Sequence, residues 1–252
     1  MFFSNVILMH NKGYTKMSAG TRSGLIGYWS FDSDFKENIY NLSPTTSSAV
    51  SLNADALKKN SAYFNGGSKL QFSTPSYFLN NNDVTVSGWF KSYDLSGTVG
   101  NISYYRQIFQ CYYWRFNVST GHYGIEIGTS GNKLRTQWGG GASSVSVLDS
   151  STTFNTNTWY HFAFIFQKSV AAKIYINGAL NNQQTGTSPI TWSTNSRERT
   201  TIGFASYVND YDGALIESAY LNGLADEIGY WNRALSATEV TELYGNGKGA
   251  FY

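Results

Sequence analysis

This sequence contains little cysteine, little charge and no long hydrophobic run, and each shortage excludes a class of protein. Its single cysteine, Cys111, cannot form an intrachain disulfide, so burial of apolar side chains has to stabilise the fold. Charged residues make up 13 % of the 252 positions, and 18 basic residues nearly balance 16 acidic ones without forming a cluster. Because a nucleic-acid-binding protein normally has a concentrated basic patch, we expect no nucleic-acid partner.

The apolar stretch at the N-terminus, MFFSNVILMH, is short. It has no basic segment before it and no small-residue cleavage signal after it, so we expect neither a signal peptide nor a membrane span there. Residues 1–23 show no hydrophobic periodicity, and termini of this kind are often ordered only when a partner holds them. We therefore predict an N-terminal arm over residues 1–23, anchored to other proteins of an assembly, and one domain over residues 24–252.

Aromatic residues are abundant at 17 %, and Asn, Ser, Thr and Gly fill most of the polar positions. Aromatic and β-branched residues favour pleated sheets, whereas Asn, Gly and Ser favour turns. Residues 83–91 alternate between two faces, residues 158–168 are apolar on both faces as in a central strand, and residues 65–67 carry a hairpin signal. The sequence therefore predicts one all-β domain, an antiparallel jelly-roll β-sandwich.

A second hairpin pattern covers residues 122–138. Its inner face is predicted to hold Tyr123, Ile125, Ile127 and, across the turn, Leu134 and Trp138. Glu126, Lys133 and Arg135 are predicted to face water. Cys111 lies in an apolar strand, where we expect it to be a small buried side chain.

One short helix is predicted near the C-terminus. Ser236 and Glu239 form a capping box, in which the serine accepts a backbone N–H and the glutamate reaches back. Val240 and Leu243 follow on one side, and Gly245 is a residue type that commonly ends helices. This pattern predicts a helix of one or two turns, packed on the sandwich.

Several segments together resemble a known family. They read GLIGYWSFD, AYFNG, VTVSGWFK, WYHFAFIF, KIYINGAL, TIGFA and GLADEIGYWNRALSATEVTELY, in this order. Over about residues 24–245 the chain resembles the laminin-G-like (LamG-like) jelly rolls of the concanavalin A-like lectin/glucanase superfamily. The resemblance implies two antiparallel sheets with the last strand beside the first. Some members bind glycans, some hydrolyse them and others only mediate contacts, so the fold does not specify the activity.

The catalytic pattern of the superfamily's glucanases is absent. They resemble one another in an E-x-D-x-x-E run, and the positions two away from Glu126 are Gly124 and Gly128. Asp226 and Glu227 are adjacent, so strand alternation predicts that they point to opposite faces and cannot act on one bond. We therefore expect a non-catalytic protein.

The resemblance also implies a structural Ca²⁺ near the junction of the first and last strands. Asp32, Asp34, Asn38 and Asp226 are the candidate ligands, since calcium takes six to eight oxygens. The family's usual D-S-S-G-N-G-N loop is replaced here by DFKENIYNLS. The alternative is that Asp226 only accepts hydrogen bonds at the sheet edge.

Candidate glycan-binding or partner-binding residues are aromatics in predicted loops, together with neighbouring Asn and Asp. They are Tyr104, Tyr105, Trp138, Trp192, Tyr207, Asn209, Asp210 and Tyr211. The chain has 7 Trp, 19 Tyr and 16 Phe, so most aromatic residues must lie in the core, and packing is the alternative for each candidate. Exposed aromatic residues also occur at protein–protein contacts.

From these features we predict a non-catalytic LamG-like interaction module on a virion or extracellular surface. The low charge, the Asn/Ser/Thr/Tyr-rich composition and the predicted arm favour a decoration or fibre-type protein of a virus or phage particle that contacts host glycans. The alternative is a glycan-binding lectin module of a bacterial extracellular protein. A glycoside hydrolase is the least favoured reading.

Overall fold

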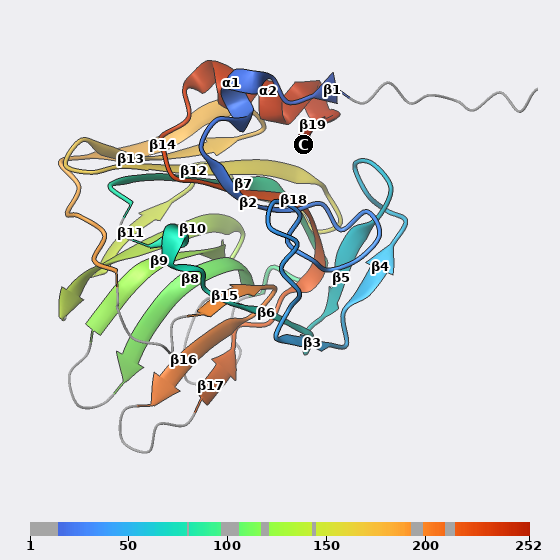
Figure 1. The fold of residues 1–252 in the computed structure, drawn as a ribbon, viewed down its shortest axis with the longest axis horizontal. Helices are drawn as coiled ribbons and strands as arrows, with labels where there is room; N and C mark the ends of the chain where they lie inside the picture. Colours follow the sequence, from blue (N-terminus) through green and yellow to red (C-terminus); the bar gives the residue numbers. More distant parts are fainter. Residues whose placement is uncertain are drawn as a thin grey trace, which may run out of the picture.

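The structure is a computed structural model, and it describes residues 15–79, 81–96, 106–116, 121–142, 145–192, 199–209 and 215–252. Two large, mainly antiparallel sheets face each other, and helices cover the outer side of one of them (Figure 1). The predicted all-β sandwich with a short C-terminal helix is therefore confirmed. No helix in the described part of the chain is long and apolar enough to cross a membrane.

The first sheet, here called the back sheet, contains the central strand that the sequence predicts. In spatial order it consists of β14 (Ala179–Thr185), β13 (Ala171–Ile176), β12 (Tyr160–Gln167), β7 (Asp83–Ser92), β18 (Asn222–Trp231), β5 (Ser61–Asn65) and β4 (Ser51–Asn53). Strand β2 (Leu25–Trp29) pairs antiparallel with β18, so the last long strand lies beside the first strand of the sandwich, as the family resemblance implies.

The second sheet, here called the front sheet, is built around a four-strand meander. Its order is β11 (Val145–Asp149), β10 (Lys133–Ala142), β9 (Gly121–Ser130), β8 (Arg106–Phe116), β15 (Arg199–Ile202), β6 (Lys69–Ser73) and β3 (Thr46–Ser48). Strand β16 (Ala205–Asn209) pairs with the end of β8 and with β17 (Leu215–Ser218).

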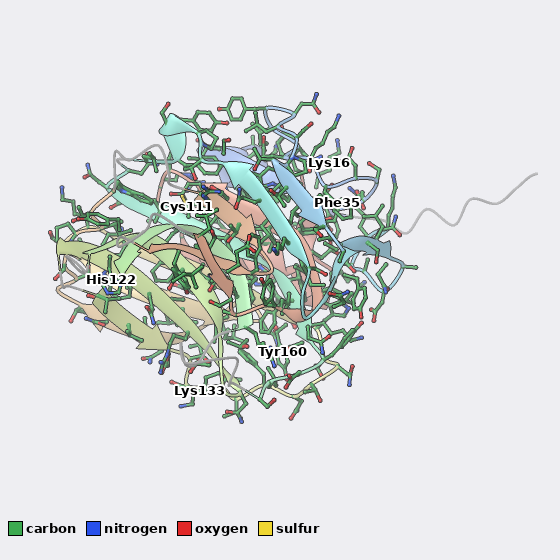
Figure 2. All side chains as sticks on the ribbon, turned by 90° about the horizontal axis from the view of Figure 1, so that it is seen from below. Lys16, Phe35, Cys111, His122, Lys133 and Tyr160 are labelled. Carbon is green, nitrogen blue, oxygen red and sulfur yellow. The ribbon has the colours of Figure 1, made fainter. Side chains whose placement is uncertain are left out.

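The space between the two sheets is filled by aromatic and aliphatic side chains. Phe162, Phe164 and Phe166 enter it from β12, and Cys111 enters it from β8, as predicted (Figure 2). Burying each phenylalanine contributes on the order of 2 kcal/mol. Ala163 from β12 points to the opposite face, into a smaller apolar cluster on the outer side of the back sheet. Both faces of β12 are therefore buried.

The outer cluster is covered by the C-terminal helix α2 (Ala237–Tyr244), which the sequence predicts. The Ser236 hydroxyl accepts the Glu239 N–H at 3.3 Å, and the Glu239 carboxylate accepts the Ser236 N–H at 2.7 Å. Val240 and Leu243 are buried in the cluster. Gly245 ends the helix with a φ of 55°, a left-handed conformation that glycine adopts readily.

The N-terminal boundary differs from the prediction. Strand β1 (Thr15–Lys16) pairs with the C-terminal strand β19 (Ala250–Phe251), and Met17 is buried beside α2. Helix α1 (Ala19–Arg22) follows, and Glu242 of α2 accepts hydrogen bonds from the Ser18 and Thr21 hydroxyls. Residues 15–23, predicted as part of an arm, therefore pack on the domain. The predicted arm over residues 1–14 lies outside the described residues.

A bulge in β18 overturns the predicted orientation of the two adjacent acids. Ala225 and Ile228 both enter the core between the sheets, although simple alternation would place them on opposite faces. The register shifts between Asp226 and Gly229, and Glu227 has a positive φ of 52°. Because the bulge inserts an extra residue, Asp226 and Glu227 both point away from the core. The prediction that they face opposite sides is wrong.

We expect Ser236→Ala to lower the free energy of unfolding by about 1 kcal/mol, because one N–H at the start of α2 loses its acceptor. The melting temperature should fall by about 2–4 °C, measured by calorimetry. Thr238→Ala, at an exposed position in the same helical turn, is the matched control and should cause no loss. Equal melting temperatures for the two variants would contradict the capping role of Ser236.

Candidate functional site

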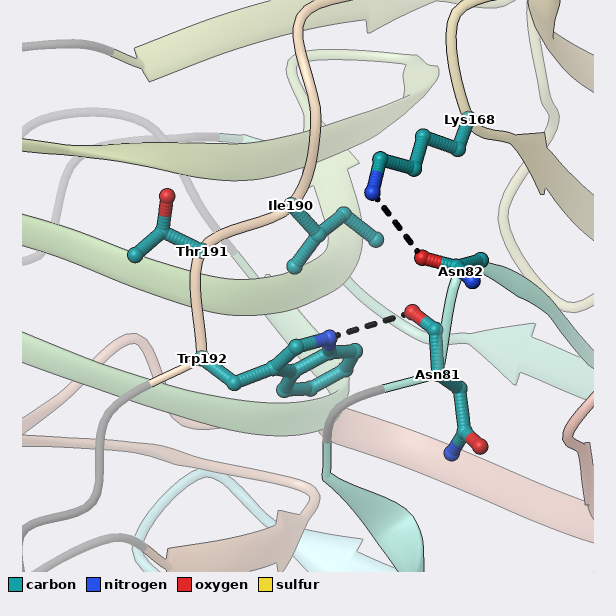
Figure 3. A pocket seen from close by; sticks show the side chains of 6 residues that line it. All are labelled: Asn81, Asn82, Lys168, Ile190, Thr191 and Trp192. Atoms are coloured by element: carbon teal, nitrogen blue, oxygen red, sulfur yellow. Dashed lines mark hydrogen bonds between the residues drawn. The ribbon is translucent and has the colours of Figure 1, made fainter.

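A pocket of about 320 Å³ lies where three connecting segments meet. This volume is at the lower end of the range for small-ligand sites. The segments are the loop between the short 3₁₀ helix η1 (Ser76–Phe78) and β7, the turn after β12, and the connection that follows β14. The pocket is lined by Asn81, Asn82, Lys168, Ile190, Thr191 and Trp192 (Figure 3).

The connection after β14 docks on two glycines of the front sheet. The Thr191 N–H donates to the Gly139 carbonyl at 2.8 Å, and the Gly124 N–H donates to the Thr191 carbonyl at 2.9 Å. Gly139 and Gly124 are directly opposite each other in β10 and β9. A Cβ atom at Gly139 would lie 2.0 Å from the His122 carbonyl oxygen, so only glycine fits there. Ile190 is buried and fixes the connection to the core.

The Trp192 indole ring is held in a defined position. Its Nε1–H donates to the Asn81 carbonyl at 3.2 Å. The Asn81 side chain in turn donates to the carbonyls of Tyr77 and Phe78, at 3.2 and 3.0 Å, which closes the end of η1. Trp192 is partly exposed and its apolar body rests against the core. The ring is thus a preformed apolar surface in the pocket wall.

Polar groups surround this ring. Lys168 Nζ donates to Asn82 Oδ1 at 3.0 Å, and the Lys168 backbone N–H donates to the Asp83 carboxylate at 3.0 Å. In the described part of the chain, no hydrogen bond uses Asn82 Nδ2 or the Thr191 hydroxyl. The pocket therefore offers amide, hydroxyl and ammonium groups next to apolar surface, which suits a ligand with C–H faces and hydroxyl groups.

The structure removes two of the predicted binding residues. Trp138 lies in β10 and is fully buried, with its ring centroid 5.8 Å from those of Phe164 and Phe166. Tyr207 lies in β16 and is also buried. Each lies in a strand whose partner layer covers the ring, so packing, the alternative given for every candidate, holds for both. Neither ring is accessible to a sugar.

Of the remaining predicted binding residues, one has a described side chain. Trp192 is the predicted aromatic residue that lines the pocket. Asn209 ends β16, but its side chain is outside the described part. The following four lie outside the described residues: Tyr104, Tyr105, Asp210 and Tyr211. Sequence reasoning missed Asn82, Lys168 and Thr191, because only the folded chain brings their three segments together.

Glu126 does not face water as predicted. It lies on the outer face of the front sheet and is 3 % exposed. Strand β16 covers this region, since the Gln110 side chain exchanges hydrogen bonds with the Ser206 N–H and carbonyl at 2.9 and 3.1 Å. Burial raises the pKa of Glu126 to about 7, although a hydrogen bond with the Tyr207 side chain opposes this shift.

The arrangement around Glu126 does not match a two-carboxylate hydrolase site. A glycosidase of that kind uses two carboxyl groups on either side of one bond. Burial accounts for the raised pKa of Glu126, and no charged neighbour among the described residues contributes to it. Asp226 and Glu227 lie in the back sheet, where Glu227 accepts a hydrogen bond from the buried Tyr28 hydroxyl.

The predicted calcium ligands do not form one site. Asp34 Oδ1 accepts the Lys36 N–H at 3.0 Å, and Asn38 Oδ1 accepts the Ser30 N–H at 2.9 Å, so both are engaged in local turns. No group of three or more His, Cys, Asp or Glu residues in the described ranges is arranged to hold a metal. This corrects the prediction for Asp34 and Asn38.

The two other predicted ligands, Asp32 and Asp226, lie near each other, and each already has a partner within the protein. Lys58 Nζ lies 2.9 Å from Asp32 Oδ2, and Asp226 Oδ2 accepts the Leu57 N–H at 3.0 Å. Burial raises the pKa of Asp226 well above its ordinary value, and the nearby Asp32 carboxylate raises it further. Because the Lys58 ammonium group already contacts Asp32, the residues present do not fit a calcium ion.

We expect Glu126→Gln to stabilise the protein at alkaline pH. The folded pKa is raised, so the wild type loses stability as pH rises from the ordinary value of 4.5 to about 7, and the loss reaches about 3 kcal/mol. Denaturant titrations of the two proteins should therefore agree near pH 4 and separate above pH 7. Glu217→Gln, at a partly exposed carboxylate, is the control and should show no such gain. A pH-independent difference for Glu126→Gln would contradict the assignment.

Solved structures with the same fold include several binding domains. Domain 4 of AbnA, a GH43 extracellular arabinanase from Geobacillus stearothermophilus in complex with arabinotriose, has a TM-score of 0.60 and 22 % identity, covering 86 % of this chain and 96 % of that one. The botulinum neurotoxin serotype C1 binding domain has a TM-score of 0.66 and 15 % identity, covering 90 % and 53 %. The binding domain of botulinum neurotoxin DC in complex with SialylT has a TM-score of 0.64 and 13 % identity, covering 89 % and 52 %.

This chain thus spans about half of each neurotoxin binding domain and nearly all of the arabinanase domain. At these identities the likeness shows the fold alone. No curated protein sequence matches the chain significantly. A family profile described as the concanavalin A-like lectin/glucanases superfamily, laminin-G type, matches residues 64–241. Since the match covers more than half of the sequence, the chain belongs to the concanavalin A-like lectin/glucanases superfamily.

Proposed function

We propose that this protein is a non-catalytic interaction module that binds an oligosaccharide in the Trp192 pocket. The observation that carries the proposal is the pocket itself. In it a fixed indole ring stands beside amide and hydroxyl groups that no hydrogen bond among the described residues uses. Sugars present C–H faces that pack on aromatic rings and hydroxyl groups that need donors and acceptors. A pocket with this mixed lining matches both requirements.

The anchoring of the pocket supports binding without rearrangement. Trp192 and Asn81 are joined by a hydrogen bond, and Thr191 is hydrogen-bonded to both β9 and β10. A ligand therefore does not have to order these segments when it binds, and preorganisation of this kind favours affinity. The Lys168 ammonium group donates to the neutral Asn82 side chain, and Lys168 is the one charged residue among those that line the pocket, so a neutral sugar is the ligand class that we favour.

The similar structures are consistent with this proposal. One is the domain of an extracellular arabinanase in complex with arabinotriose, and others are neurotoxin binding domains, one of them in complex with SialylT. Binding in these proteins makes sugar binding a natural first test for this chain. We also propose an extracellular or particle surface as its place of action, where such glycans are accessible.

A hydrolase is the weaker candidate. The chain lacks the E-x-D-x-x-E run. Burial raises the pKa of Glu126 to about 7, but this carboxyl group is covered by β16. The idea of a virus or phage decoration or fibre-type protein stays a prediction from composition, and none of the similar structures named above is viral. Since residues 15–23 pack on the domain, residues 1–14 are the part of the predicted arm that is left for a contact with such an assembly.

Trp192→Ala is expected to weaken oligosaccharide binding at least about tenfold, because it removes the apolar surface of the pocket. Binding would first be identified on a glycan array that includes arabinotriose and sialylated glycans, and then measured by titration calorimetry. Trp159→Ala is the matched control, since Trp159 is partly exposed at the opposite end of β12 from Lys168 and donates to Asp55. This control should leave the affinity unchanged.

Asn82→Ala provides a second variant with little risk to folding, because Asn82 is exposed. We expect it to weaken binding as well, by removal of the side-chain amide. Absence of binding to every glycan on the array would refute the proposal. Binding that survives Trp192→Ala unchanged would place the sugar site elsewhere on the domain.

A further inference from the structure

The loop between β4 and β5 joins the two acids at the seam between the first and last strands. The Leu57 N–H donates to Asp226 Oδ2 at 3.0 Å, and Asn60 Nδ2 donates to the Asp32 carbonyl at 2.8 Å. Between these two residues, Lys58 Nζ contacts Asp32 Oδ2 at 2.9 Å. Three donors of one loop therefore connect the segment that follows β2 to β18.

Lys58 is well enclosed for a lysine. Its side chain is 21 % exposed and that of its partner Asp32 is 12 % exposed. The ammonium group also lies 5.4 Å from the ring centroid of Phe251 in β19, a cation–π distance. Phe251 is buried, and its carbonyl accepts the Met17 N–H at 2.8 Å. Lys58 thus stands where the first strand, the last long strand and the chain's C-terminal strand meet.

Two carboxyl oxygens at the seam have no hydrogen-bond donor among the described residues. Asp226 is 0 % exposed, and Asp32 Oδ1 and Asp226 Oδ1 are buried without a hydrogen bond in the described part of the chain. Buried acceptors of this kind call for a cation or a proton nearby. A calcium ion would have to approach carboxylate oxygens to 2.3–2.6 Å, and the Lys58 ammonium group already contacts Asp32.

We propose that the Lys58 ammonium group takes the place of a structural calcium ion at this seam, so that the fold is held together without a metal. The cation belongs to the chain and arrives with the same loop that supplies the Leu57 and Asn60 donors. The domain therefore closes its seam independently of the calcium concentration. This inference does not depend on sugar binding in the Trp192 pocket, which lies at other loops.

Melting temperatures of the wild-type protein provide the first test. We expect the same value in excess EDTA and in millimolar calcium chloride, because Lys58 already supplies the cation at the seam. Lys58→Met should lower the melting temperature by about 5 °C, since it leaves a poorly solvated carboxylate without its cation. Lys69→Met is the matched control, because Lys69 pairs with Glu217 at a more exposed position. It should change the melting temperature by less than about 2 °C.

A double variant separates charge compensation from simple packing. In Lys58→Met with Asp32→Asn, the uncompensated carboxylate is removed together with the ammonium group. We expect this double variant to regain most of the melting temperature that Lys58→Met loses, because coupled charges give non-additive effects. It also keeps the test informative if Lys58→Met alone does not fold.

Three results would overturn the inference. The first is a wild-type melting temperature that falls in EDTA or rises with calcium, which would show a metal at work. The second is a loss in Lys58→Met no larger than in Lys69→Met. The third is a double variant that remains as unstable as Lys58→Met, which would mean that Lys58 acts through packing and not through its charge.

Discussion

Burial of the back sheet on both of its faces is the constraint on which the rest of the structure depends. Phe162, Phe164 and Phe166 require the front sheet on one side of β12, and Ala163 and Ile165 require α2 on the other. The covering layer on the outer side needs a fixed position, which the capping box and the contacts of Glu242 provide. Strands β1 and β19 pair with each other, and Met17 and Ala250 add to the apolar cluster under this layer.

The same constraint leaves the connecting segments to form the candidate binding site. Since the sheets are stabilised by their shared core, the loops around Asn81, Lys168 and Thr191 do not have to contribute to it. They are held by a few hydrogen bonds to strand ends, and Ile190 provides one apolar anchor. A stable sandwich with preorganised loops is an arrangement suited to recognition, and it needs no catalytic group.

Buried acids are treated differently in the two sheets. Glu126 is enclosed by β16, and burial raises its pKa to about 7, so that it holds its proton more readily than an exposed glutamate. Asp32 at the seam is instead paired with the Lys58 ammonium group. Both solutions follow from the same physical requirement, because an ionised carboxylate removed from water must be protonated or compensated.

The sequence by itself determined the all-β class, the central strand over residues 158–168, the capping box at Ser236 and the family. These features depend on local periodicity and short-range hydrogen bonds, which are set by residues close together in the sequence. Only the tertiary structure decided that Tyr207 and Glu126 are buried, that a bulge turns Glu227 away from the core, and that Lys58 meets Asp32. Each of these outcomes depends on layers and loops distant in sequence, because burial and charge pairing are set by whatever segment packs against a residue.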